Sequence, residues 1–182
     1  MEGSLHSTED YVEALKNVLD IPELKSYLEH NVVAPMDYPG QVFVRRAISY
    51  YLNSEDGSGL SPLLLHIVPI IGPLHVSLNA RETVLMLNYD FFNNLYCEVY
   101  KKKRQLAKKP KPYRINILLE IAVTGWNLIK TDVMKKILNC KDAEVRYLID
   151  LLDNIVPLVL DFYPIIFRSG HWPAYIEAMF RV

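Results

Sequence analysis

Asn31-Val-Val-Ala-Pro-Met36 is a short run rich in β-branched residues, and it ends at Asp37-Tyr-Pro-Gly40. The run predicts a buried strand, and the residues after it predict a turn that leads into a helix over 41–52. A second apolar run, residues 63–71, follows after a polar loop. Strand, helix and strand in this order predict a βαβ unit over about residues 31–71, with two parallel strands joined by a right-handed crossover.

Helical patterns lie on both sides of this unit. Ser7 and Asp10 have the spacing of a capping box at the start of a first helix. The helix that starts at Tyr113 has the strongest apolar stripe, formed by Ile115, Leu118, Leu119, Ala122, Val123 and Trp126. Asp142 is placed to cap a helix that extends to about residue 154. Pro157 and Pro164 are expected to break the apolar stretch that follows into short pieces.

These patterns predict an α+β protein that is mostly α-helical. A small parallel β element lies within a first region, residues 1–88, and an all-helical region follows over 89–182. The last helix, from Trp172, has no stop signal before the sequence ends. We therefore expect the chain to be a fragment of a longer protein, truncated at its C-terminus.

Composition limits the class of protein. The 182 residues are 51% apolar and 23% charged, with a net charge of −1, which fits an ordinary globular domain and excludes a disordered tail or a collagen-like fibre. Two apolar runs, residues 63–78 and 149–167, are interrupted by histidine and proline in the first and by three aspartates in the second. Because such residues are costly inside a bilayer, neither run is expected to span a membrane.

Charge is concentrated in one segment. Residues 101–114 contain eight of the 20 basic residues and no acidic one, which leaves 12 basic against 21 acidic residues elsewhere. The basic residues of this segment are Lys101, Lys102, Lys103, Arg104, Lys108, Lys109, Lys111 and Arg114. The segment is interpreted as a nucleic-acid-binding block, as a solvated linker between two helices, or as a nuclear import signal formed by residues 101–104. Tyr96, Tyr100 and Tyr113 flank it and would either stack on bases or pack on helix faces.

Two further side chains are candidates for chemistry. Asp37 follows the first predicted strand, at the end where ligands gather in open α/β sheets, and its carboxylate is a candidate ligand for Mg²⁺. His75 follows the second strand and is a candidate partner of a carboxylate or a scissile phosphate. The alternatives are a turn-forming aspartate and a histidine that bonds a backbone carbonyl.

The order of these parts resembles the second half of an RNase H-like DNA transposase core. In that family a catalytic Asp follows one strand, a helix and another strand come next, and a motif with a histidine follows; here these are Asp37 and Gly72-Pro-Leu-His75, with Asn79 four residues later. A helical domain is then inserted, which the region from Tyr89 onward would represent. The chain is also similar, over about residues 32–170, to uncharacterised mobile-element proteins that share Gly-Pro-Leu-His-Val-Ser-Leu-Asn79.

The resemblance implies a nucleic-acid-associated protein with DNA as a partner. Asp37 and His75 would be its catalytic residues, and Asp37 would bind Mg²⁺ if the complete catalytic core were present. No earlier strand ending in Asp and no convincing late Glu are visible, so this chain alone is expected to be inactive. One alternative is a non-enzymatic helical protein-interaction domain, and another is a small-molecule enzyme that uses Asp37 and His75. We expect an intracellular protein, and a nuclear one if residues 101–104 act as an import signal.

Overall fold

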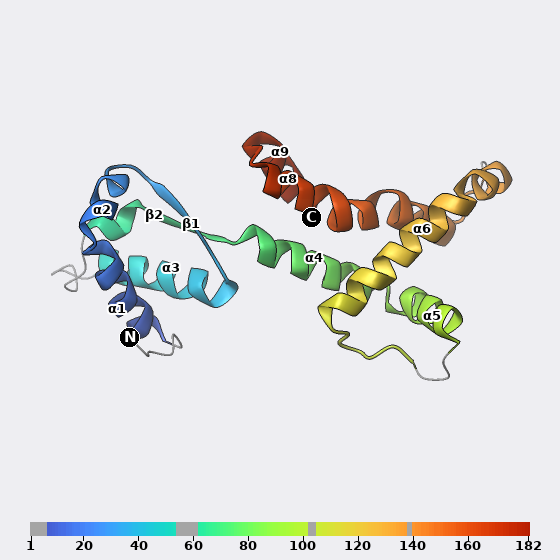
Figure 1. The fold of residues 1–182 in the computed structure, drawn as a ribbon, viewed down its shortest axis with the longest axis horizontal. Helices are drawn as coiled ribbons and strands as arrows, with labels where there is room; N and C mark the ends of the chain where they lie inside the picture. The colour runs from blue at the N-terminus through green and yellow to red at the C-terminus, as the bar shows by residue number, and fades with distance from the viewer. Residues whose placement is uncertain (1–6, 54–61, 102–104, 138–139) are drawn as a thin grey trace. The chain divides into compact units, whose positions relative to one another are not determined.

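The computed structural model describes residues 7–53, 62–101, 105–137 and 140–182. These residues are mostly α-helical and include one two-stranded parallel sheet (Figure 1). The predicted fold class, an α+β protein dominated by helices, is therefore confirmed. The chain divides into two compact units, residues 1–75 and 76–182, which are described separately below.

The first unit begins with the predicted capped helix. In α1 (Thr8–Leu19) the backbone N–H of Asp10 donates to Oγ of Ser7 at 3.2 Å, and the N–H of Ser7 donates to Oδ2 of Asp10 at 2.9 Å. The capping box therefore satisfies two N–H groups that have no partner inside the helix. Two short helical segments follow, α2 (Pro22–Lys25) and η1 (Tyr27–Glu29).

The predicted βαβ unit is present. β1 (Val32–Met36) pairs in parallel with β2 (Ile67–Ile71), in a register that runs from Val32 opposite Ile67 to Met36 opposite Ile71. Between the strands lie α3 (Tyr38–Asn53) and η3 (Pro62–His66). The prediction of parallel strands is therefore confirmed.

The prediction that β1 is a buried strand was wrong for one of its faces. Val32 and Ile67 pack on a core of Leu19, Leu28, Ala47 and Leu64. Val33 and its partner Val68 are 45% and 40% exposed. Side chains alternate along a strand, and the described helices of this unit cover only the face that carries Val32 and Ile67.

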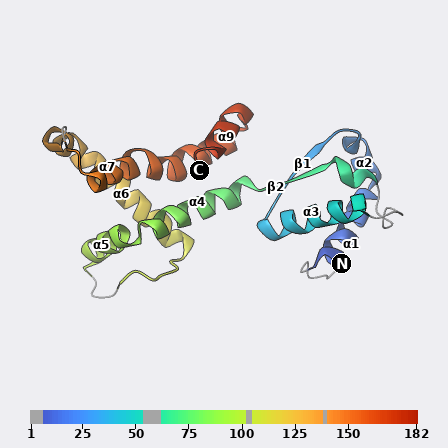
Figure 2. The same ribbon diagram turned by 180° about the vertical axis from the view of Figure 1, so that it is seen from behind.

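The second unit is helical in its described residues. Its elements in order are α4 (Pro73–Leu87), whose first residues belong to the first unit, α5 (Tyr89–Tyr100), α6 (Pro112–Ile137), α7 (Ala143–Asp150), η4 (Leu151–Ile155), η5 (Leu158–Phe162), α8 (Tyr163–Ser169) and α9 (Trp172–Met179) (Figures 1 and 2). Asp142 caps α7 as predicted, because its carboxylate accepts from the N–H groups of Glu144 and Val145. No described helix combines the length and apolar character needed to cross a bilayer.

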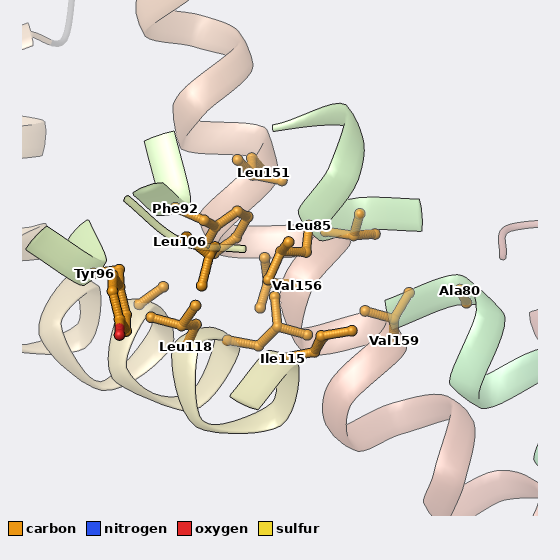
Figure 3. Close-up of a cluster of buried hydrophobic side chains, with 13 residues drawn as sticks. Ala80, Leu85, Phe92, Tyr96, Leu106, Ile115, Leu118, Leu151, Val156 and Val159 are labelled. Atoms are coloured by element: carbon orange, nitrogen blue, oxygen red, sulfur yellow. The ribbon is translucent and has the colours of Figure 1, made fainter. Parts of the chain in front are cut away.

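The core of the second unit contains the predicted stripe of α6. Ile115, Leu118, Leu119 and Ala122 belong to the same buried cluster as Phe92 of α5, and Figure 3 shows Ile115, Leu118 and Phe92 within it. Residues of α4 belong to the same core, since Ala80, Val84 and Leu85 are buried in it. For this reason the two compact units divide between His75 and Val76. The sequence had predicted a boundary between residues 88 and 89.

The prediction that Pro157 and Pro164 interrupt the C-terminal stretch was wrong. Residues 143–169 are helical throughout. Pro157 lies two residues after the end of the wide π-helical turn η4, and Pro164 lies two residues after the end of η5. In η5 the N–H of Tyr163 donates to the carbonyl of Leu158 instead of that of Val159. Pro164 has no N–H to donate to the carbonyl of Leu160. The carbonyls of Val159 and Leu160 are therefore left without these helical donors.

Arg81 of α4 supplies donors to both carbonyls. Its Nε donates to the oxygen of Val159 at 3.1 Å and its Nη2 to that of Leu160 at 3.3 Å. Its Nη1 donates to Oδ1 of Asn116 at 2.9 Å, which connects the same guanidinium to α6. Burial lowers the pKa of Arg81, and the positive charge of Arg168 lowers it further. The guanidinium stays charged at any ordinary pH, so it stabilises the helical path through Pro164.

Candidate functional site

Asp37 lies at the junction of β1 and α3. Its carbonyl accepts from the N–H of Gln41 at 3.0 Å, and its Oδ1 accepts from the N–H of Gly40 at 2.8 Å. A side-chain oxygen that bonds an N–H of the first turn acts as an N-cap. A Cβ on Gly40 would lie 2.7 Å from that oxygen, so a larger residue there would displace the capping carboxylate. The exposed carboxylate of Asp37 therefore stabilises the start of α3.

His75 lies at the same edge of the sheet. The N–H of Gly72 donates to the carbonyl of Met36 at 2.7 Å, which continues the pairing just past β2. A Cβ on Gly72 would lie 3.5 Å from Cδ2 of His75, so the imidazole lies beside the residue that faces Met36. Asp37 and His75 thus both follow the carboxyl ends of the paired strands, as predicted.

Catalytic and metal-binding roles for these two residues stay predictions. Among the described residues, no hydrogen bond or ion pair connects Asp37 with His75 and no cluster of three or more His, Cys, Asp or Glu side chains forms. The carboxylate interacts electrostatically with Tyr11 of α1. Burial raises the pKa of the Tyr11 phenol, and the negative charge of Asp37 raises it further.

Two substitutions of Asp37 distinguish its role as a helix cap from a role as a metal ligand. We expect Asp37→Ala to lower the free energy of unfolding by about 1 kcal/mol, because α3 loses its side-chain cap. Asp37→Ser keeps a capping oxygen and removes the carboxylate, so it should retain most of the stability. Urea unfolding followed by circular dichroism measures both. Equal stability of wild type and Asp37→Ala would contradict the capping role, and a Mg²⁺-induced stabilisation present in wild type but lost in Asp37→Ser would support the metal site.

The described part of the basic segment is anchored to the second unit. The side chain of Leu106 is 2% exposed, its N–H donates to Oδ1 of Asn93 at 2.8 Å, and its carbonyl accepts from the hydroxyl of Tyr89. Pro110 is buried as well. Leu106 and Pro110 therefore anchor the described part of the connection between α5 and α6.

The described lysines of the segment are open to solvent. Lys101, Lys108, Lys109 and Lys111 are exposed, and in the described part of the chain none of them forms an ion pair. Lys101 ends α5 in a left-handed conformation with φ of 48°. Predicted binding residues Lys102, Lys103 and Arg104, and with them most of the predicted import signal, lie outside the described residues.

Four side chains of α5 and α6, two of them within the segment, form a continuous row. The ring centroids of Tyr100 and Tyr96 are 5.0 Å apart. The guanidinium carbon of Arg114 lies 5.9 Å from the ring centroid of Tyr96 and 5.8 Å from that of Tyr113. These distances are those of aromatic and cation–π contacts. We call Tyr100, Tyr96, Arg114 and Tyr113 the Tyr–Arg row. Tyr96 is 7% exposed, whereas Tyr100 and Tyr113 are 41% and 55% exposed.

The second unit also contains an apolar groove of about 600 Å³. Its lining side chains carry no charge and come from α5, α6, α7 and η4. They are Phe91, Leu95, Ile121, Ala122, Gly125, Trp126, Leu128, Ile129, Val133, Ile137, Val145, Leu148, Ile149 and Leu152. Leu128 is 82% exposed at this groove. An open apolar surface of this kind is a common feature of binding sites.

A polar contact near the groove was not predicted from the sequence. Oδ1 of Asp153 in η4 accepts from Nε1 of Trp126 at 2.6 Å and from Nζ of Lys130 at 2.7 Å. Burial alone would raise the pKa of Asp153, but the hydrogen bonds from Lys130 and Trp126 outweigh it and lower that pKa. The three residues connect α6 to the first π-helical turn. Only the pairing of a buried indole with an acidic residue could have indicated this contact, and the sequence does not show which acid.

Comparisons with protein-family models, with curated proteins and with solved structures return no match for this chain.

Proposed function

We propose that this chain is a nucleic-acid-associated protein that binds phosphate backbone through the basic segment 101–114. The observation that carries the proposal is the anchored presentation of Lys101, Lys108, Lys109 and Lys111. Exposed lysines without acidic partners, in a segment without acidic residues, repel one another unless an anion neutralises them. A row of phosphates is such an anion, and its binding releases counterions.

The sheet edge supports a transposase-like origin for the same protein. A parallel βαβ unit with Asp37 and His75 at the carboxyl ends of its strands has the order of parts found in the second half of an RNase H-like core. Parallel sheets are normally covered on both faces, and the exposed pair Val33 and Val68 fits a sheet that belongs to a larger core. We therefore propose that the chain is a transposase-like fragment that is inactive by itself and associates with DNA.

The salt dependence of binding tests the proposal. If the four lysines and Arg114 each neutralise one phosphate, the logarithm of the affinity should fall with a slope of about 3.5–4.5 against the logarithm of salt concentration. The affinity for a labelled oligonucleotide would then drop roughly 100- to 500-fold between 50 and 200 mM salt. Fluorescence anisotropy titrations at four salt concentrations measure this slope.

A matched pair of charge-reversal variants tests the location. Lys108→Glu, Lys109→Glu and Lys111→Glu together should abolish detectable binding. The control is Lys135→Glu, Lys136→Glu and Lys141→Glu together, which makes the same change in net charge at exposed positions elsewhere in the second unit. Equal loss in both variants would show that only overall charge matters. Absence of binding by the wild type at low salt would overturn the proposal and leave the interaction-domain alternative, for which the apolar groove is the corresponding surface.

A further inference from the structure

We propose that the described part of the basic segment, with Lys101, Lys108, Lys109 and Lys111, binds single-stranded in preference to duplex nucleic acid, because unpaired bases stack on the exposed rings of the Tyr–Arg row. This inference rests on the proposed function and names the class of nucleic acid that the same site takes. The row and the lysines are close in the chain, since Tyr100 precedes Lys101 and Tyr113 follows Lys111 by two residues, and all four are exposed. A strand held by its phosphates along the lysines would therefore have its bases next to the two rings.

The orientation of the rings is fixed by the protein. Arg114 lies over Tyr113 and Tyr96 together, and Tyr96 is buried in the core of the second unit. Tyr113 is thus held through Arg114 to a buried residue, and yet its side chain is 55% exposed. A ring that is held in place and open to solvent loses little conformational entropy when a base stacks on it.

Base stacking discriminates between the two forms of nucleic acid. In a duplex the faces of the bases are already stacked on one another, so exposed protein rings gain contact only with an unpaired base. Phosphate contacts are available in both forms. The lysines therefore supply affinity for either form, and Tyr113, together with Tyr100, supplies the preference for a single strand.

The experiment compares one labelled thymine-rich single strand with a duplex of the same length. Wild type should bind the single strand more tightly. Tyr113→Ala should weaken that binding about 5- to 150-fold, as removal of one stacking platform does, and should change duplex binding by less than about twofold because the phosphate contacts remain. Tyr113→Phe keeps the ring and should bind as wild type does. Tyr147→Ala, which removes an exposed tyrosine of α7, is the control for loss of a surface ring.

A 2-aminopurine base in the single strand gives a second readout. Its emission should be quenched when it stacks on the protein in wild type and in Tyr113→Phe, and much less in Tyr113→Ala. This inference would be overturned if the wild type bound both forms with equal affinity and Tyr113→Ala had the same affinities as the wild type. A steep salt dependence of binding would in that case still support the proposed function. Absence of binding to either probe would overturn the proposed function itself.

Discussion

Replacing Arg81 by methionine should lower the free energy of unfolding of the second unit by about 3–5 kcal/mol. A hydrogen bond from a charged donor contributes roughly 1.5–3 kcal/mol to stability, and the contributions of several such bonds are not additive. The variant loses the bonds to the carbonyls of Val159 and Leu160 and to the amide oxygen of Asn116. Methionine keeps much of the apolar length of the side chain. The expected loss of stability therefore measures the cost of removing the Arg81 donors from backbone carbonyls in the π-helical region.

Urea unfolding followed by circular dichroism measures this effect. Arg81→Lys should be intermediate, because a single ammonium group does not reproduce the planar fork of the guanidinium. Arg146→Met removes an exposed arginine of α7 and should change stability by less than about 0.5 kcal/mol. Stability of Arg81→Met equal to that of wild type would show that water replaces the guanidinium at both carbonyls.

Removing the carboxylate of Asp153 is expected to destabilise the same unit by about 2–4 kcal/mol at neutral pH, because two charge-assisted hydrogen bonds are lost. In Asp153→Ala the indole N–H of Trp126, whose side chain is 6% exposed, loses its acceptor. Lys130 is 44% exposed and can return to water at low cost. Most of the loss should therefore come from the unsatisfied indole, and Asp153→Asn, which keeps an acceptor oxygen, should lose less.

The lowered pKa of Asp153 predicts a specific dependence on pH. A carboxyl group whose pKa is lower in the folded state contributes stability above its unfolded pKa of about 3.9, and this contribution is lost as the pH falls through the folded pKa. The difference in stability between wild type and Asp153→Asn should thus be constant above about pH 5 and shrink below about pH 4. Asp150→Ala is the control, because this carboxylate accepts a hydrogen bond from exposed Asn154. A difference that does not vary with pH would contradict the role of the ionised carboxylate.

Local signals in the sequence predicted much of the fold. The capping box of Ser7 and Asp10 determines where α1 begins, and the stripe of α6 buries the side chains that its spacing indicated. The change from helical to β-branched periodicity at Val32 predicted the parallel pair. Each of these signals depends on residues that are close in sequence, and local hydrogen bonding or burial is enough to produce the element.

Long-range contacts could not be predicted in the same way. The helix continues past Pro164, where Arg81, nearly eighty residues earlier, donates to the carbonyls of Val159 and Leu160. Proline alone favours a break, and the contacts of α4 with this region act against that preference. The burial of α4 with the helices that follow it has the same origin, since Ala80, Val84 and Leu85 gain their partners only in the folded core.

The charge pattern of the sequence predicted the location of the candidate site but not its geometry. The excess of lysine in 101–114 needs no structure to detect, whereas the anchors at Leu106 and Pro110 depend on packing. Tyr96, Tyr100 and Tyr113 were all predicted to be candidates for stacking. The structure distinguishes them, because Tyr96 is buried and the other two are exposed.

The π-helical turns also change how the C-terminal stretch responds to protein engineering. Leu151 and Val156 are five positions apart, which on a uniform helical wheel places them about 140° from each other. Both are nonetheless completely enclosed in one cluster, because the wide turn accommodates an additional residue. A designer who assigned inner and outer positions from a uniform wheel would mistake one of them for a surface position. Mutational scans from residue 151 onward therefore need the phase of the helix to be restarted after each wide turn.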